Sequence, residues 1–92
     1  MIAKLSDGFT LEVDDDVAED QLVMDDLAAS LKGDIVASSS LVLRVLGEKN
    51  RKLLYDHLKK DNGRVSSKAV GEAIGEIIVC CQAGKNSSAS PN

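Results

Sequence analysis

Residues 41–58 constrain the fold of this 92-residue chain more than any other stretch. Apolar residues recur there at helical spacing, Leu41, Val42, Val45 and Leu46 in the first half and Leu53, Leu54 and Leu58 in the second. Gly47 separates the two runs and can adopt the left-handed conformation that ends a helix. We therefore predict two short helices that meet at Gly47 and that need cover from the segments on either side.

The N-terminus has the pattern of a β-hairpin. Phe9, Leu11 and Val13 alternate with polar residues, as in a half-buried strand, and residues 6–8 (Ser-Asp-Gly) are typical of a turn. A two-residue loop would mix polar and apolar side chains on one face. A three-residue loop pairs apolar residues throughout, namely Leu5 with Phe9, Ala3 with Leu11 and Met1 with Val13. We predict this second register, within residues 1–14.

Two longer helices are predicted on either side of the glycine hinge. The first covers residues 17–32, with Asp16 as its N-cap and a buried stripe of Val23, Met24, Leu27, Ala28 and Leu31. The last covers residues 67–82, with regular apolar spacing at Val70, Ala73, Ile74, Ile77, Ile78 and Cys81. Residues 34–37 are predicted to form a connection, after which Ser38, Ser39 or Ser40 caps the next helix.

These elements predict a mainly α protein, a small bundle of about four helices with a short N-terminal β-hairpin. We predict one helical domain in residues 1–83 and a disordered tail in residues 84–92, which are small and polar. The chain starts without the apolar region of a secretory signal and contains no apolar run long enough to span a bilayer. We therefore expect the protein in the cytoplasm.

Charge is distributed unevenly along the chain. Residues 1–35 carry ten acidic and two basic side chains, whereas residues 36–68 carry eight basic and three acidic ones. This polarity can be satisfied within one molecule, between copies stacked head to tail, or against a partner. Nucleic acid is not favoured as that partner, because the acidic third adjoins the basic stretch and only Phe9 and Tyr55 could stack on bases.

No residue pattern predicts catalysis. His57 is the only histidine, and its place in a helical apolar pattern favours a structural role. Asp14, Asp15 and Asp16 lack the spacing of a metal site and a companion histidine, so we expect them to cap a helix and lie in solvent.

Two other motifs resemble metal sites only superficially. Gly63 at the sixth position of a calcium loop would leave Asn62 as the one side-chain ligand, so residues 61–66 are predicted to end a helix. Cys80 and Cys81 are adjacent, and no second pair exists to complete a zinc site. We therefore predict no enzymatic activity, no cofactor and no metal.

Several motifs follow one another in an order that is more informative than any one of them. They are the hairpin at residues 4–13, the acidic run at 14–16, Leu46-Gly47-Glu48, His57-Leu58, residues 61–65 and the polar segment at 85–91. In this order, over nearly the whole chain, the protein resembles a tail assembly chaperone of long-tailed bacteriophages or prophages. It departs from the family at Gln21-Leu22-Val23-Met24, where many members have an aromatic residue.

The resemblance implies a non-enzymatic protein in the cytoplasm of a bacterial host. Such proteins bind the long, helical tape measure protein and keep it soluble while tail tube subunits assemble around it. The resemblance also implies the short form of a frameshifted pair, since Gly84, Lys85 and Asn86 can be encoded by a slippery sequence. Expected partners are the tape measure protein, a second copy or the longer form; neither a membrane nor nucleic acid is expected.

Four apolar residues are the expected contacts with the partner, because a core this small has room for few more side chains: Ile35, Val36, Val42 and Ile78. Two other functions remain open. One is a structural role, as a head–tail adaptor or tail completion protein that stays in the virion. A small DNA-binding regulator would instead use the basic stretch at residues 44–68.

Overall fold

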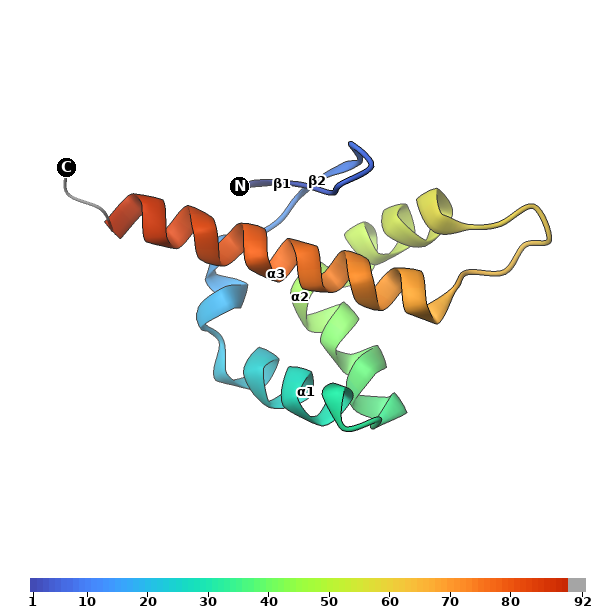
Figure 1. The fold of residues 1–92 in the computed structure, drawn as a ribbon, viewed down its shortest axis with the longest axis horizontal. Helices are drawn as coiled ribbons and strands as arrows, with labels where there is room; N and C mark the ends of the chain where they lie inside the picture. Colours follow the sequence, from blue (N-terminus) through green and yellow to red (C-terminus); the bar gives the residue numbers. More distant parts are fainter. Residues whose placement is uncertain (90–92) are drawn as a thin grey trace.

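The computed structural model describes residues 1–89 and is mainly helical, with a two-stranded N-terminal hairpin (Figure 1). The elements are β1 (Ile2–Lys4), β2 (Thr10–Glu12), a 3-10 helix η1 (Asp15–Glu19), α1 (Gln21–Leu31), α2 (Ile35–Leu58) and α3 (Ser67–Ala89). The predicted fold class is confirmed. The predicted number of about four helices is slightly too high, since the described residues form three α-helices with a break inside the second.

Gly47 breaks α2 into two parts, residues 35–46 and residues 48–58. Its φ of 74° and ψ of 172° lie outside the helical region and in a region that only glycine occupies readily. The hinge predicted from the sequence is therefore confirmed. The first part of α2 packs on α1, and the second part turns toward the hairpin (Figure 1).

The hairpin has the register that was predicted from its apolar pattern. Ala3 lies opposite Leu11, the Leu5 amide donates to the Phe9 carbonyl at 2.8 Å, and the Val13 amide donates to the Met1 carbonyl at 2.8 Å. The inward face is buried and consists of Ala3, Leu5, Leu11 and Val13. A one-residue slip would turn this whole face to water, so burial fixes the register.

The second part of α2 holds the outer edge of β2. Asn50 Nδ2 donates to the Glu12 carbonyl at 2.7 Å. In the last turn of the helix, the His57 ring stacks on Phe9 with centroids 3.9 Å apart, and its Nε2 lies 2.7 Å from Asp7 Oδ2. The structural role predicted for His57 is thus a link between the hairpin loop and α2.

Helix α3 runs along the outer edge of β1. The Ser6 amide donates to Glu76 Oε1 at 2.7 Å, and one helical turn later Cys80 Sγ lies 3.7 Å from the Lys4 carbonyl. An unpaired strand edge invites pairing with another chain, and covering it with a helix removes that risk. The hairpin therefore packs along α3 through β1 and is tied to α2 by the Asn50 hydrogen bond to β2.

The core lies where the hairpin, α2 and α3 meet. The predicted stripe on α3 is confirmed at Ala73, Ile74, Ile77, Ile78 and Cys81, all buried. They pack with the α2 residues Leu41, Val42, Val45, Leu46 and Leu54. The predicted stop after α2 is also confirmed, because the helix ends at Leu58 and Ser66 Oγ then accepts from the Ala69 amide at the start of α3.

The predicted helix at residues 17–32 is wrong in its first turns. Asp14 caps η1 by accepting from the Asp16 amide at 3.0 Å, and Asp20 caps α1 by accepting from the Leu22 amide at 2.8 Å. Asp16 is therefore not the N-cap. An aspartate can accept from the amide two residues on, and the chain uses Asp14 from the acidic run and Asp20 beyond it to start two successive helices.

The predicted connection at residues 34–37 is also wrong, because α2 already begins at Ile35. Asp34 Oδ1 accepts from the Ala37 amide at 3.0 Å and is the N-cap. The serines that were expected to cap the helix instead hold it against α1. Ser38 Oγ lies 2.6 Å from Ser30 Oγ, and Ser40 Oγ donates to Asp26 Oδ2 at 2.7 Å.

Two further expectations differ from the structure. Ala28 and Leu31 are exposed, so the buried stripe of α1 is shorter than predicted and consists of Val23 with the half-buried Met24 and Leu27. Helix α3 continues past residue 82 to Ala89, where a disordered tail was predicted from residue 84. The rest of that predicted tail, residues 90–92, lies outside the described residues.

Replacing Gly47 by alanine should lower the free energy of unfolding by about 1–3 kcal/mol, because a Cβ is strained at this φ and ψ. Gly71 is the matched control. It lies within α3 with open space for a Cβ, so Gly71→Ala should raise stability by up to about 1 kcal/mol. Urea denaturation followed by circular dichroism measures both. Equal effects of the two substitutions would contradict the hinge geometry.

The Asp7 carboxylate should make the stability of the fold depend on pH. The hydrogen bond from the Phe9 amide, followed by that with His57, lowers the pKa of this carboxyl from its usual value of 3.8. Because the pKa is lower in the folded state, the ionised carboxylate stabilises the fold at pH values above its ordinary pKa. This stabilisation is lost as the pH falls through the lowered pKa. Asp7→Asn should therefore melt at a lower temperature than wild type at about pH 6, and the difference should shrink at about pH 2.

The control for Asp7 is Asp61→Asn, in the exposed loop after α2. Its melting temperature should follow that of wild type at both pH values. A melting difference between Asp7→Asn and wild type that stays constant from neutral to acid pH would contradict the assigned role of the carboxylate.

Candidate functional site

The four residues predicted to bind a partner fall into two groups. Ile35 and Val36 are 82% and 79% exposed, as a contact surface requires. Val42 and Ile78 are 5% and 4% exposed and belong to the core, so the expectation that they form available surface is wrong. The bend at Gly47 and the overlying α3 bring these two side chains into the shared interior.

A third exposed residue joins the first group. Leu31, at the end of α1, is 80% exposed and lies across the short turn from Ile35 and Val36. We call Leu31, Ile35 and Val36 the apolar tip. Scattered exposed aliphatic residues are ordinary, but three large ones at one helix–helix turn are a candidate contact surface.

The turn that carries the apolar tip is held by backbone hydrogen bonds. The Gly33 amide donates to the Ser30 carbonyl at 2.9 Å, and the Asp34 amide donates to the Ala29 carbonyl at 3.1 Å. Gly33 has a φ of 95°, which ends α1, and Asp34 caps α2 directly afterwards. The Gly33-Asp34 pair is the sequence signal that could have placed Ile35 in the first turn of α2.

Polar contacts along the two helices fix the tip further. Asp26 Oδ2 accepts from both Ser40 Oγ at 2.7 Å and Arg44 Nε at 2.8 Å. The hydrogen bond from Ser40, and then the Arg44 guanidinium, lower the pKa of the Asp26 carboxyl. With the contact between Ser30 and Ser38, these bonds set the position of α1 along α2.

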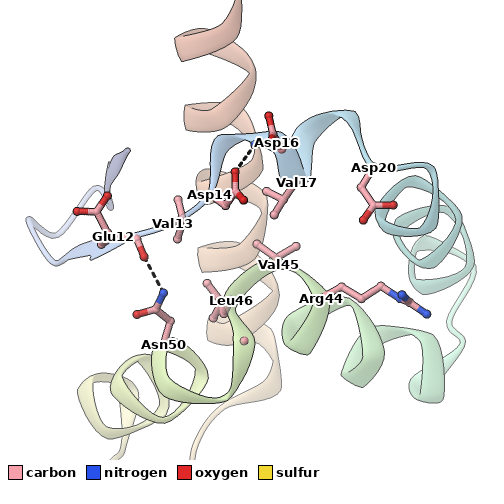
Figure 2. Close-up of a pocket in the computed structure, with 11 residues that line it drawn as sticks. Glu12, Val13, Asp14, Asp16, Val17, Asp20, Arg44, Val45, Leu46 and Asn50 are labelled. Carbon is pink, nitrogen blue, oxygen red and sulfur yellow. Dashed lines mark hydrogen bonds between the residues drawn. The ribbon is translucent and has the colours of Figure 1, made fainter.

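A second candidate is the pocket in Figure 2, between the 12–20 segment and the bend of α2. It has a volume of about 370 Å³, and its lining mixes apolar side chains with mostly acidic polar ones. Its lining consists of Glu12, Val13, Asp14, Asp16, Val17, Asp20, Arg44, Val45, Leu46, Gly47 and Asn50. The Arg44 side chain extends away from Asp14, toward α1, where it bonds Asp26 (Figure 2).

The acidic groups around this pocket have structural tasks. Asp14 and Asp20 cap the two helices, and the Glu12 carboxylate pairs with the N-terminal ammonium group at 3.1 Å. The carboxylate oxygens of Asp14, Asp15 and Asp16 lie within 4.8 Å of one another in a largely exposed cluster. The predicted capping role of the acidic run is confirmed, although the capping residue differs.

A shallow hollow of about 610 Å³ lies between β1 and α3, lined by Lys4, Leu5, Ser6, Gly75, Glu76, Val79 and Cys80. Both cysteines are free thiols. Cys80 is half-buried at this hollow, whereas Cys81 is fully buried. Burial, reinforced by the nearby negative charge of Asp15, raises the pKa of the Cys81 thiol, which keeps it protonated and unreactive.

Within residues 1–89, none of the helices combines the length and the apolar character that crossing a bilayer requires. No family model matches the chain, and the searches of curated proteins and of solved structures give no match either.

The two thiols should react at very different rates. Native protein should release one equivalent of thionitrobenzoate with Ellman's reagent, from Cys80, while Cys81 reacts at least about tenfold more slowly until the protein unfolds. In Cys80→Ser, the fast phase should disappear, and one thiol should become reactive in denaturant. Fast labelling that persists in Cys80→Ser would contradict the burial of Cys81.

Proposed function

We propose that this protein is a non-enzymatic assembly chaperone of long-tailed phage and that it binds the tape measure protein through the apolar tip in the cytoplasm of the host. The observation that supports the proposal is the exposure of Leu31, Ile35 and Val36, between 79% and 82%, at a turn whose backbone is well held. Of the four contact residues predicted from the sequence, the proposed contact includes Ile35 and Val36 and omits Val42 and Ile78. It adds Leu31.

The chemistry of the tip suits a helical partner with few specific features. Aliphatic side chains bind by burial alone, without the directional demands of hydrogen bonds, so they tolerate different registers along a long apolar helix. The absence of tryptophan and the presence of only two other aromatic residues in the chain fit such an adaptable contact.

The tip also limits the strength of each contact. Burying a Leu, Ile or Val side chain contributes about 1.5–3 kcal/mol, so three side chains at about 80% exposure contribute roughly 4–7 kcal/mol. Association itself costs about 4–15 kcal/mol, so one copy binds weakly unless neighbouring surface adds to the contact. Several copies on one long partner would gain by avidity, which matches the task of covering a rod.

The motifs behind the resemblance support the same proposal. They include the hairpin with its three-residue loop and the Gly47 junction. These two features shape the core, and the apolar tip projects from that core. The side chains that could carry chemistry, such as His57 and Asp7, are engaged with each other at the hairpin. We infer an interaction protein rather than an enzyme.

The double substitution Leu31→Lys and Ile35→Asp should abolish solubilisation of a co-expressed tape measure protein and leave the fold intact. Lysine is favourable in the last turn of a helix and aspartate in the first, and both positions are exposed, so melting should change little. The soluble fraction of the partner after centrifugation is the measurement, with circular dichroism as the check on folding.

Val79→Asp is the matched control, since Val79 is 62% exposed on α3 and lies outside the tip. It should solubilise the partner as wild type does. Ile78→Asp should fail for a different reason, because it places a charge in the core and unfolds the protein. Full solubilisation by the tip variant would refute the proposed contact.

A further inference from the structure

The connection between α2 and α3 is basic and projects from the molecule. Residues 59–66, which we call the basic loop, extend away from the two helices and return to the start of α3 (Figure 1). They carry Lys59, Lys60 and Arg64 against the single acidic residue Asp61, in a chain whose net charge is −4. None of residues 59–66 belongs to the core, and residues 59–64 are all exposed. The basic loop therefore presents positive charge to solvent without contributing to the interior.

The basic loop is closed by a tight turn. The Lys60 amide donates to the Arg64 carbonyl at 2.8 Å, and the Gly63 amide donates to the Lys60 carbonyl at 2.9 Å. Gly63 has a φ of 84°, and Asn62 Oδ1 accepts from the Arg64 amide at 2.9 Å. A three-residue loop with glycine in the left-handed region is a standard hairpin turn. The backbone that carries Lys60 and Arg64 is thus held in one conformation.

The N-terminal hairpin contains the same turn. The Leu5 amide donates to the Phe9 carbonyl at 2.8 Å, the Gly8 amide donates to the Leu5 carbonyl at 2.9 Å, and Gly8 has a φ of 94°. There, the residues at the two ends of the turn, Leu5 and Phe9, both pack against the core. Residues that lie opposite each other in such a pair project from the same face. Lys60 and Arg64 therefore present their charges on one face of the basic loop.

This arrangement is unfavourable for the protein alone. Like charges directly opposite each other destabilise a strand pair. Within residues 1–89, neither the Lys60 nor the Arg64 side chain takes part in a hydrogen bond or an ion pair, whereas Lys59 lies 4.0 Å from Asp56. A local conflict of this kind is expected where residues serve binding rather than stability. An anionic group between the two side chains would relieve the repulsion.

A carboxylate suits this position better than a phosphate backbone does. Arg64 offers a planar fork of donors and Lys60 an ammonium group, so one carboxylate can accept from both. Nucleic acid carries about one negative charge per 1.7 Å of duplex, so binding it here would also bring phosphates near Asp56 and Asp61. Residues 59–66 also contain no aromatic side chain on which a base could stack. The charge pattern favours the separate carboxylates of an acidic protein segment.

We propose that the basic loop is a docking site for an acidic segment of a partner protein, with one carboxylate of that segment bound between Lys60 and Arg64. The site lies outside the apolar tip and does not depend on which partner binds there. Its backbone is already held by hydrogen bonds, so binding requires little ordering of the loop. Exposed ion pairs are individually weak and screened by salt, so the affinity should be moderate and should fall as salt is added.

Fluorescence anisotropy tests the docking site with a labelled helical peptide of about 20 residues that has glutamate at every fourth position. The salt concentration is about 0.1 M, which screens charges more than about 10 Å away. Wild type should bind this peptide and should not bind the matching glutamine peptide. The double variant Lys60→Gln and Arg64→Gln should bind at least about tenfold more weakly. The matched control, Lys49→Gln with Lys52→Gln on the exposed face of α2, should lose less than about twofold.

The stability of the fold should change in the opposite direction from binding. Lys60→Glu sets opposite charges across the turn, so its melting temperature should exceed that of wild type by about 1–5 °C in about 0.01 M salt. The gain should vanish in about 1 M salt. The same variant should lose peptide binding, and its higher melting temperature excludes unfolding as the cause. A melting temperature at or below that of wild type in low salt would contradict the assigned pairing of Lys60 with Arg64.

Three binding results would overturn the inference. The first is peptide binding that persists in Lys60→Glu or falls equally in the Lys49→Gln, Lys52→Gln control, since the charge then acts as a diffuse field. The second is tighter binding of a labelled single-stranded oligonucleotide of similar length, which assigns the loop to nucleic acid. The third is a wild-type mass in sedimentation equilibrium that falls on Lys60→Glu, which places a second copy at the loop. Failure to solubilise the tape measure protein bears on the apolar tip alone.

Discussion

The packing of the β-hairpin between α2 and α3 is the interaction on which the rest of the structure depends. A two-stranded hairpin is marginally stable by itself, and the two helices would expose Leu54 and Ile77 without it. Together they enclose one interior. Asn50 and Glu76 bind the two outer edges of the hairpin, so its position between the helices is set by hydrogen bonds as well as by burial. Because these bonds are exposed, their main effect is on geometry rather than on stability.

The bend at Gly47 lets one helix serve two separate structures. Its second part supports the hairpin, and its first part pairs with α1. The core thus uses the apolar side chains near the bend, among them Val42, Val45 and Leu46, while the far end of the α1–α2 pair keeps its apolar residues in solvent. The same sequence feature that closes the core therefore leaves the apolar tip outside it.

The sequence predicts those parts of the fold in which the spacing of apolar residues and the position of a single glycine point to the same structure. The register of Leu5 with Phe9, the hinge at Gly47 and the stripe on α3 all follow from local pattern. Helix starts were less predictable, because the chain offers several equivalent caps in a row. Asp14 and Asp20 are the N-caps where Asp16 was expected, and Asp34 is the N-cap where a serine was expected.

The errors at the candidate site have the same physical origin. Periodicity identifies which face of a helix is apolar, but whether that face is covered depends on where other elements pack. Ile78 and Val42 were expected at the surface and lie under neighbouring elements, whereas Leu31 was expected in the core and has no neighbour above it. Leu31 is exposed because α2 begins at Ile35. The chain then turns back along α1 directly after the turn, and no other element packs over that turn.

The separation of tip and core has a consequence for how such a protein can change. Substitutions at Leu31, Ile35 or Val36 alter the contact surface and leave the interior untouched, because each side chain is about four-fifths in solvent. The reverse does not hold, since the tip depends on the Asp26 contacts and the Asp34 cap for its shape. Under the proposed function, partner preference changes through substitutions at three positions, while the polar residues beneath them hold the shape of the turn.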